Sequence, residues 1–529
     1  MTLWKKRKEV SLNRDIISYL SKVRDIDNAE EYLNPPATVL HSPLLLKNII
    51  KAYERVKRAI DNRESIVIVS DPDVDGMTST VIMYHYLKKV SRGKIQIATH
   101  ERSKGHGAQN TILPNDIDLL IIVDSSSSEV NACRKLSKHM DIVILDHHIV
   151  EKDNPYAIIV NPQQKGCDYP NKHLSAAGVV FKFVELLDYH YKKVNTDYYL
   201  DLVATGLLAD QMRMDILENR WFVKNGLKQI NNAGLLALIY ESRNNGKEIN
   251  SQIINFSIVP VLNTVARNDQ IRKGITLLLL QDFFEARKMA KTLLLLNEER
   301  KRKVELLVDE YEKIMANEKF IFVTSPNATK NYNGLIAQKL ASKYMKPAFV
   351  LKDNDSILAG SYRSYAGFNL LDFLKRCPYV KKAAGHSEAG GFEIDKSNFQ
   401  SFKEYVDKNI SEDMFESSIV YDIELKEEDI DFNLADKIAQ FDFIYGNGSP
   451  KITLKIEDVF IEERELFPKN TKKHVKVVSD GFDMLKFNDS DYAKDVDSWS
   501  IVDVVGDISI NEWGKDRRIQ LFLKDYKVK

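Results

Sequence analysis

The chain has 529 residues, enough for several domains, and 44% of them are apolar, so it can bury hydrophobic cores and is not a disordered protein. Its 76 basic and 76 acidic residues cancel, which excludes a protein held to nucleic acid by bulk positive charge, although a local basic groove beside an acidic site would give the same total. The three cysteines have no disulfide or zinc spacing, and this fits a reducing, cytoplasmic location.

The N-terminal 60 residues predict helices. A basic start is followed by no apolar stretch, and no apolar run in the chain approaches ~18 residues, so we expect neither a signal peptide nor a membrane span. Apolar residues then recur at helical spacing in IISYLSKV and LLLKNIIKAYERVKRAI, and Pro35 and Pro36 separate the two stretches. We therefore expect an N-terminal helical segment over residues 1–60.

The hydrophobic period changes after this segment. Short runs rich in β-branched residues occur at 66–69, 119–123 and 142–145, and helical stretches such as 77–90 and 129–138 lie between them. Continuous apolar strands that alternate with helices are typical of a parallel sheet covered on both faces. The pattern predicts a doubly wound α/β domain over 61–280.

Two further domains are expected. The charged stretch from Phe283 to Ala316 contains neither Pro nor Gly and predicts a long connecting helix over 281–318, with an amphipathic surface helix as the alternative. Strand patterns at 320–323, 348–351 and 356–363 flank a helix at 334–344, which predicts a smaller α/β domain over 319–415. The strand-rich remainder, 416–529, favours a small β-barrel or sandwich.

Acidic and imidazole groups follow each strand of the first domain. They are Asp71, Asp73 and Asp75 after the first strand, Asp124 after the second, Asp146, His147 and His148 after the third, and Asp210 at the end of the helix LDLVATGLLAD. In an open α/β sheet these strand ends line one crevice. So many carboxylates would repel one another without cations, and carboxylates with imidazoles suit two Mn²⁺ or Mg²⁺ ions. Two such ions can share a water, activate it and clamp a phosphate.

Simpler readings exist for each motif alone. Asp-x-Asp-x-Asp-Gly also resembles a calcium loop, but such a loop lies between helices and has Glu at its twelfth position, where this chain has Ile82. Asp-His-His could be a helix cap with core histidines, and Asp210 could be an ordinary helix-end residue. The ordered combination is more specific than any one of its members.

The motifs together resemble the RecJ family of the DHH phosphoesterase superfamily over nearly the whole chain. The stretches that carry the resemblance are EEYLNPPATVLHSPLLLKNIIKAYERVKRAI, DPDVDGMTST, ILDHH, NPQQKGCDYPNKHLSAAGVVFKF, DLVATGLLAD, VLNTVARND, GSYRSYAGFNLLDFL, AAGHSEAGGFEI, IYGNGSP and VDVVGDISINEWGKDRRIQLFLKD. The resemblance implies a DHH domain, a connecting helix, a DHH-associated domain and a C-terminal OB-fold. It also implies removal of mononucleotides from the 5′ end of single-stranded DNA, in recombination and repair.

The resemblance assigns roles to individual residues. It implies two divalent metal ions, Mn²⁺ or Mg²⁺, held by Asp71, Asp73, Asp75, Asp124, His147 and Asp210. The catalytic group comprises His148, which would face the scissile phosphate, with Asp124 and Arg102. The expected nucleic-acid contacts are Arg102, Asn263, Arg267, Ser361, Arg363, Gly385 and His386. Tyr362, Tyr365 and Phe368 are candidates for base stacking, with core packing as the alternative for Phe368. Single-strand-binding protein is a candidate partner, and we expect a monomer.

The chain departs from the family pattern in several places. Pro72 and Val74 replace an aromatic residue and an alanine, VDSSSSE replaces VDCGxxS, and Ala384 stands where the family has its first glycine. Superfamily relatives often carry a ligand histidine at the position of Val69, and Asp71 would substitute for it. None of these changes removes a catalytic group.

Two other functions remain open at this point. One is a DHH phosphodiesterase for short RNA or cyclic dinucleotides, whose relatives are usually compact two-domain chains. The other is an inactive nucleic-acid-binding scaffold, which the complete set of acidic and histidine residues disfavours. Cleavage of labelled DNA discriminates among the three.

Overall fold

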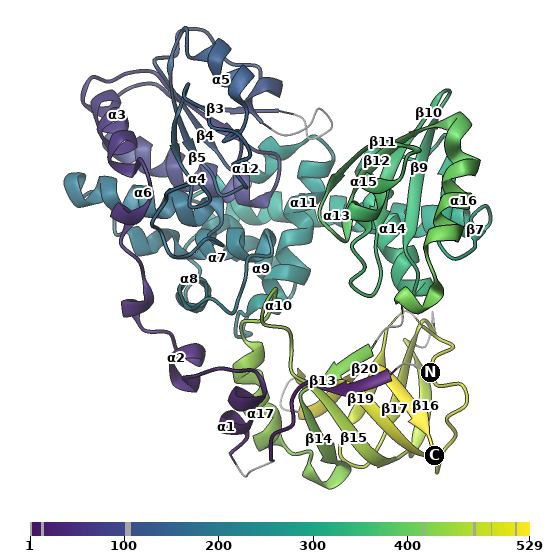
Figure 1. The fold of residues 1–529 in the computed structure, drawn as a ribbon. Helices are drawn as coiled ribbons and strands as arrows, with labels where there is room; N and C mark the ends of the chain where they lie inside the picture. Colours follow the sequence, from purple (N-terminus) through teal and green to yellow (C-terminus); the bar gives the residue numbers. More distant parts are fainter. Residues whose placement is uncertain are drawn as a thin grey trace. The chain divides into compact units, whose positions relative to one another are not determined.

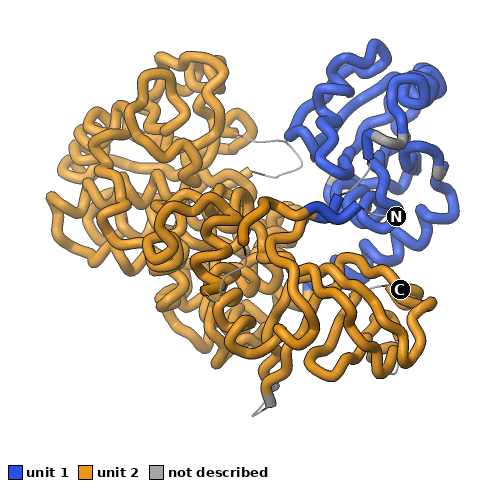
Figure 2. The backbone as a smooth tube through the Cα atoms, turned by 60° about the horizontal axis from the view of Figure 1, so that its bottom comes forward, with its two compact units in different colours: residues 1–5, 296–419 blue, residues 6–295, 420–529 orange. Residues whose placement is uncertain are grey.

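The computed structural model describes residues 3–11, 15–100, 107–415, 418–468, 472–487, 489–513 and 516–529 (Figure 1). The chain divides into two compact units (Figure 2): unit 1 comprises residues 1–5 and 296–419, and unit 2 comprises residues 6–295 and 420–529. No helix in the described part of the chain is long and apolar enough to span a membrane.

A five-stranded parallel sheet forms the core of the first part of unit 2. Its strands are β2 (Ile66–Ser70), β3 (Ile95–Thr99), β4 (Leu119–Val123), β5 (Asp141–Leu145) and β6 (Ile158–Val160), in the order β3-β2-β4-β5-β6. The predictions of β2, β4 and β5 are confirmed. Strand β3 was missed because Gln96 and Thr99 interrupt its apolar pattern, and β6 was missed because it has only three residues.

The strand order changes direction beside β2. The chain runs from β2 to β3 on one side and returns to place β4 on the other, so the topological switch point lies between β2 and β4. Ser70 pairs with Val123, and Val123 pairs with Leu145, so the carboxyl ends of the three strands are level. The residues that follow them therefore share one edge of the sheet, where open α/β folds bind ligands.

Helices surround this sheet. They are α3 (Ile49–Asp61), α4 (Val74–Val90), α5 (Val130–Leu136), α6 (Ala176–Tyr191), α7 (Leu200–Ala209), α8 (Leu217–Lys228), α9 (Ala233–Glu241), α10 (Ser251–Ile253), α11 (Val259–Arg267) and α12 (Ile271–Leu279). Helix α4 packs against β2 and also against α6, α7 and α12. The predicted helices 77–90 and 129–138 correspond to α4 and α5.

Unit 1 contains a six-stranded sheet in the order β11-β12-β10-β9-β8-β7. Its strands are β7 (Ala316–Asn317), β8 (Ile321–Ser325), β9 (Ala348–Asn354), β10 (Ile357–Arg363), β11 (Val380–Gly385) and β12 (Ala389–Asp395), and its helices are α14 (Lys330–Tyr344), α15 (Leu370–Arg376) and α16 (Phe399–Asn409). Alternate residues of β8 and β9 enter two hydrophobic clusters, one for each face. The helix α13 (Phe283–Glu312) is continuous over 30 residues, and the boundary between the units falls within it.

The C-terminal part of unit 2 is a seven-stranded sheet in the order β14-β15-β19-β20-β18-β17-β16. Its strands are β14 (Ile423–Lys426), β15 (Thr453–Phe460), β16 (Glu463–Phe467), β17 (His474–Val478), β18 (Asp483–Lys486), β19 (Ile501–Trp513) and β20 (Asp516–Val528). A further pair, β1 (Leu3–Lys6) with β13 (Ser418–Tyr421), forms a two-stranded sheet. The strand-rich prediction is confirmed, but the helix α17 (Phe432–Asp442) was not foreseen.

The N-terminal residues divide between two cores. Helices α1 (Ile16–Val23) and α2 (Ala29–Leu33) contribute Tyr19, Leu20 and Leu33 to the core of the seven-stranded sheet. Helix α3 instead packs against β6 of the parallel sheet. Residues that are contiguous in sequence therefore stabilise two different parts of unit 2.

Candidate metal centre and nucleic-acid contacts

The loop after β2 positions three aspartates. Asp73 caps α4 by accepting a hydrogen bond from Gly76 N at 2.9 Å, which places Asp75 in the first turn of the helix. A Cβ at Gly76 would lie 2.4 Å from Asp71 O, so this tight loop requires glycine there. Asp71 is buried and accepts a hydrogen bond from Gly107 N at 3.3 Å.

Asp75 is held by the beginning of another helix. Its two carboxylate oxygens accept hydrogen bonds from Ala176 N at 2.7 Å and Ala177 N at 3.1 Å, in the first turn of α6. A Cβ at Gly206 would lie 2.3 Å from Asp75 Oδ1, so glycine in α7 makes room for this carboxylate. Burial, and then the neighbouring Asp73, raises the pKa of Asp75 to about 7.

Asp124 follows β4 in an unusual environment. It is 1% exposed, and neither carboxylate oxygen has a hydrogen-bond partner among the described residues. Burial, and then the charges of Asp73 and Asp75, raise its pKa well above the ordinary value. A buried carboxylate without donors is costly unless a cation joins it.

The loop that carries Asp124 keeps a shape that favours glycine. Asp124 has φ of +65° and Ser126 has φ of +75°, and Ser126 occupies the position where the family pattern has its glycine. Ser126 Oγ accepts a hydrogen bond from Ala108 N at 3.0 Å and donates one to Glu129 Oε2 at 3.1 Å. The substituted serine therefore retains the left-handed backbone and gains two contacts that a glycine would lack.

The residues after β5 orient two imidazoles. His147 Nε2 lies 3.2 Å from Asp124 Oδ1, 3.3 Å from Asp210 Oδ2 and 3.8 Å from Asp75 Oδ2. Burial, and then the charge of His148, lowers the pKa of His147 to about 4, which keeps it neutral and able to act as a ligand. Asp210, at the C-terminal end of α7, has its pKa raised to about 8 by burial and then by Asp75.

Asp146 supports this arrangement without facing the cluster. It accepts hydrogen bonds from His147 N at 2.7 Å and from His148 Nδ1 at 2.8 Å. Burial acts to raise the pKa of Asp146, but the hydrogen bond and charge of His148 lower it below its ordinary value. Burial likewise acts to lower the pKa of His148, and the bond to Asp146 raises it to about 9. The sequence motif did not reveal that Asp146 is an orienting residue.

The ligand atoms gather into three overlapping groups, each within 4.8 Å. The groups are Asp75 with His147 and Asp210, Asp71 with Asp73 and Asp124, and Asp124 with His147 and His148. All six sequence-predicted ligands and His148 are thus brought together. Oxygen and imidazole donors, with Asp124 and His147 Nε2 lacking hydrogen-bond partners among the described residues, fit divalent cations such as Mn²⁺ or Mg²⁺.

The structure adds one imidazole that the sequence did not suggest. His100 directly follows β3, is buried, and points Nε2 to within 3.9 Å of Asp71 Oδ1. Its Nδ1 lies 3.1 Å from Thr111 Oγ1. Because β3 was not recognised as a strand, nothing in the sequence placed His100 at this edge of the sheet.

The predicted nucleic-acid contacts lie on separate elements. Asn263 and Arg267 are half-buried on α11, which packs against α4, the helix that carries Asp75. Arg102 lies outside the described residues. Ser361, Arg363, Gly385 and His386 belong to unit 1. None of the described residues among these contacts belongs to the metal-ligand cluster. Their roles in binding nucleic acid therefore stay predictions.

In unit 1 these residues form a compact group of their own. Arg363 ends β10, and its guanidinium lies against Gly334 of α14, where a Cβ would come within 2.9 Å of Nη2. Gly385 has φ of +132°, whereas Ala384 has no positive φ. Alanine at position 384, in place of the family's glycine, therefore costs no backbone strain. Tyr362 is fully buried and donates a hydrogen bond to His386 O at 2.8 Å.

The stacking prediction for Tyr362 is therefore wrong, because its ring belongs to the core. Tyr365 and Phe368 are half-buried at the edge of the same cluster, and Phe368 contacts Phe415 with ring centroids 5.4 Å apart.

The seven-stranded sheet, with the segment before β15, carries a row of aromatic rings that ends at a lysine. Ring centroids of Phe467 and His474 are 5.1 Å apart, those of His474 and Phe487 are 5.1 Å apart, and those of Phe487 and Phe522 are 5.9 Å apart. Lys451 Nζ lies 5.8 Å from the Phe522 ring and 4.8 Å from the Tyr445 ring. We call these six residues the cation–aromatic surface. It combines π faces with positive charge, as single-strand-binding grooves do.

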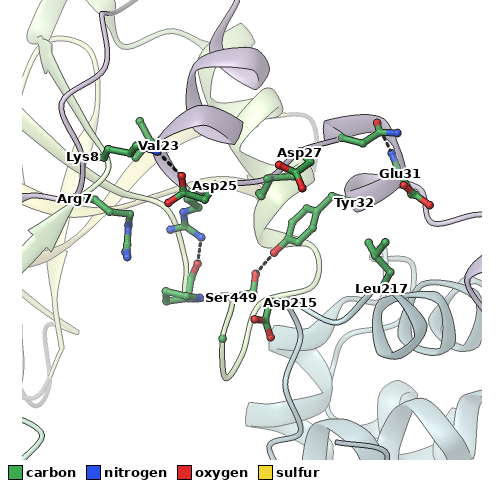
Figure 3. A pocket seen from close by; sticks show the side chains of 15 residues that line it. Arg7, Lys8, Val23, Asp25, Asp27, Glu31, Tyr32, Asp215, Leu217 and Ser449 are labelled. Atoms are coloured by element: carbon green, nitrogen blue, oxygen red, sulfur yellow. Dashed lines mark hydrogen bonds and ion pairs between the residues drawn. The ribbon is translucent and has the colours of Figure 1, made fainter. Parts of the chain in front are cut away.

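A cavity of about 530 Å³ lies elsewhere in unit 2, between the N-terminal segment and the C-terminal sheet (Figure 3). Most of its charged groups are paired. Lys8 pairs with Asp25, Arg7 and Arg24 pair with Asp422, and Asp215 pairs with Arg213, while Tyr32 Oη lies 2.6 Å from Ser449 Oγ. This internal pairing indicates a structural junction and not a ligand site.

Known proteins resemble this chain over most of its length. The model of the DHH family, N-terminal domain, matches residues 65–207, and that of the RecJ OB domain matches residues 421–525. The single-stranded-DNA-specific exonuclease RecJ of Bacillus subtilis is 31% identical over an alignment of 544 positions, which covers 97% of this chain and 68% of that protein. The crystal structure of RecJ from Thermus thermophilus in complex with Mn²⁺ superposes with a TM-score of 0.81 at 22% identity, covering 99% of this chain and 79% of that one. Its complex with Mg²⁺ gives 0.75 at the same identity, with 99% and 78% covered.

Proposed function

Because the chain belongs to the RecJ family of the DHH superfamily, we propose that it is a metal-dependent exonuclease that degrades single-stranded DNA to mononucleotides from the 5′ end. The observation that carries the proposal is the buried cluster at the switch point of the parallel sheet. Six carboxylate and imidazole side chains converge there, and Asp124 has no hydrogen-bond donor among the described residues.

Two divalent ions would be held by Asp71, Asp73, Asp75, Asp124, His147 and Asp210. When bound, two ions supply an activated water and charge compensation on the scissile phosphate. The protein contributes a fixed donor set. The backbone N–H groups of Ala176 and Ala177 orient Asp75, and Gly206 leaves space for it.

His148 would act on the substrate. Its side chain is 56% exposed, while its Nδ1 is tied to Asp146 at 2.8 Å. This bond orients the ring and leaves Nε2 directed away from Asp146, where it can donate a proton to a phosphate or leaving oxygen. Asp146 is thus a positioning residue for both imidazoles.

Other groups would bind the strand. Arg102, Asn263 and Arg267 in unit 2, and Ser361, Arg363, Gly385 and His386 in unit 1, are the proposed backbone contacts. The cation–aromatic surface would hold a longer strand by stacking and charge, without reading sequence. A surface of this kind suits a polymer substrate better than a cyclic dinucleotide or a short RNA.

The same proposal includes single-stranded DNA as the substrate, single-strand-binding protein as a candidate partner, a monomeric state and a cytoplasmic location. The three cysteines, Cys133, Cys167 and Cys377, are all buried free thiols, which suits a reducing compartment.

The deciding experiment uses single-stranded DNA labelled at either end, with Mn²⁺, Mg²⁺ or chelator. We expect metal-dependent release of mononucleotides from the 5′ end, lost in Asp124→Ala and His148→Ala. The exposed Asp153→Ala is the matched control and should retain activity. Cleavage of dinucleotides alone would move the chain to the short-substrate enzymes, and strand binding without cleavage in either metal would make it a scaffold.

A further inference from the structure

A second group of aromatic and apolar side chains lies on the seven-stranded sheet, and it is exposed. Trp499 is 78% exposed, Phe460 is 37% exposed and Ile501 is 45% exposed. Phe460 pairs with Ile501 at one end of the β15–β19 ladder, and the rings of Phe460 and Trp499 lie 5.6 Å apart. An exposed tryptophan next to other apolar side chains marks an interaction site more often than an accidental feature of a surface.

The backbone holds Trp499 outward. Its φ is +78°, a left-handed conformation that a bulky side chain rarely adopts, and its N–H donates a hydrogen bond to Ile461 O at 2.7 Å. The following Ser500 closes a turn by donating its N–H to Asp497 O at 3.1 Å. The turn thus fixes the indole in solvent, and Phe460 is the one aromatic ring among the described residues that contacts it.

The charges around these three side chains are mainly negative. Carboxylates occur on the strands and turns that carry them, at Glu427, Asp458, Glu462, Asp497 and Asp503. Glu427 Oε2 accepts the Phe460 N–H at 3.0 Å, while its Oε1 is buried without a partner among the described residues. The cations nearby are Lys426, Lys527 and Lys529. Lys527 stands opposite Asp503 in the β19–β20 ladder, and Lys529 is paired with Asp458 at 2.5 Å and with Asp503 at 3.0 Å. Among the described residues, Glu462 and Asp497 have no ion-pair partner.

This surface differs in charge from the cation–aromatic surface. In the cation–aromatic surface, Phe522 pairs with Asp507, which in turn pairs with Thr453 at one end of the β15–β19 ladder. Phe460 and Ile501 pair at the other end of that ladder. Seven residues of strand separate the ends by roughly 20 Å. Stacking rings beside a lysine suit a phosphodiester strand, but rings beside carboxylates repel one.

We propose that Trp499, Phe460 and Ile501 form a docking site for a protein segment that presents lysine or arginine beside an apolar side chain. The apolar side chain would cover the indole, and the cations would face Glu462 and Asp497. This inference is independent of the proposed nuclease activity, because none of its residues belongs to the metal centre or to the proposed DNA contacts.

The test uses the full-length protein and three fluorescein-labelled synthetic peptides. One alternates lysine with leucine, one alternates glutamate with leucine and one alternates lysine with glycine; a labelled oligo(dT) is the fourth probe. Fluorescence anisotropy should show that the lysine–leucine peptide binds best and that added salt weakens its binding. Trp499→Ala should weaken that binding by about tenfold or more, and the Glu462→Gln, Asp497→Asn double variant should weaken it while leaving the apolar contacts intact.

Phe487→Ala provides the matched control, because it removes an exposed ring from the other surface. We expect it to weaken oligo(dT) binding and to leave the lysine–leucine peptide unaffected, while Trp499→Ala does the reverse. Loss of oligo(dT) binding in Trp499→Ala would overturn the proposal and make this surface a nucleic-acid platform. Equal binding of the glutamate–leucine peptide, or no peptide binding tighter than about 1 mM, would also overturn it.

Discussion

Two buried aspartates in unit 2 have almost the same exposure and opposite surroundings. Asp124 is 1% exposed and has no hydrogen-bond donor among the described residues, and its neighbours are other carboxylates and the neutral His147. Asp422 is 0% exposed and accepts hydrogen bonds from Arg7 at 2.6 Å, from Arg24 at 2.9 and 3.0 Å, and from Thr453 N at 2.9 Å. Burial acts to raise the pKa of Asp422, but Arg24 outweighs it and lowers the pKa.

The difference teaches that burial alone does not mark a functional carboxylate. Asp422 is complete within the protein, since two arginines neutralise it and join the N-terminal segment to the C-terminal sheet. The charge of Asp124 is not compensated by a donor among the described residues, so it requires a cation from outside the chain. The same residue type is structural in one place and functional in the other because of the donors around it.

The largest expected effect is on catalysis at Asp124. Asp124→Asn keeps the size of the side chain but removes its charge, so we expect the rate of DNA cleavage to fall by more than about 100-fold. The metal-free variant should be at least as stable as the parent, because one repelling charge is gone. Urea unfolding in chelator checks the stability. If Asp124→Asn remained active and lost stability, Asp124 would be a structural residue like Asp422.

Asp422→Ala should act on stability instead. It leaves Arg24, which is 8% exposed, with no carboxylate partner among the described residues, and we expect a loss of about 3–5 kcal/mol in the free energy of unfolding. Activity per folded molecule should stay close to that of the parent. Urea unfolding in Mn²⁺, combined with cleavage rates corrected for the folded fraction, separates the two effects.

The pH dependence of stability should also distinguish the two kinds of carboxylate. In chelator the folded protein keeps protons on Asp75 and Asp210, whose pKa values are about 7 and 8, while the unfolded chain releases them near pH 4. Stability therefore falls as pH rises from about 4 to 8. Asp422 has a lowered pKa, so its contribution is present at neutral pH and is lost in acid.

Mn²⁺ should remove the decline toward alkaline pH, because the ion replaces the protons, and should leave the acid loss unchanged. Melting temperatures measured across pH in chelator and in Mn²⁺ show this directly. An identical alkaline decline in both conditions would mean that the cluster does not bind the ion.

The smallest expected effect concerns the loop that presents Asp124. Ser126→Gly and Ser126→Ala both remove the hydroxyl contacts to Ala108 N and Glu129, but only alanine retains the cost of φ at +75°. Ser126→Ala should therefore be less stable than Ser126→Gly by roughly 1 kcal/mol. Equal stabilities in thermal unfolding would show that the loop relaxes when the hydroxyl is removed.

Much of the metal centre could be predicted without coordinates, because its members follow strands that local apolar patterns identify. Asp71, Asp124 and His147 each come within a few residues of such a strand, and parallel strands bring their ends to one edge. His100 was not predicted as part of the site, because Gln96 and Thr99 interrupt the apolar pattern of β3. Asp146 was visible in the motif, but its orienting role depends on a 2.8 Å contact with His148.

The aromatic residues show the limit most clearly. Tyr362 was expected to stack with bases, yet packing makes it part of the core, and Phe487 and Trp499 were not singled out although both are exposed. By itself the sequence determined the order of the elements and the residues at the ends of the strands, because both follow from local periodicity and from residue type. Only the tertiary structure decided which carboxylates receive donors and which rings meet cations or carboxylates. Both depend on contacts between residues far apart in the chain, such as Arg24 with Asp422, and local sequence patterns do not reveal such contacts.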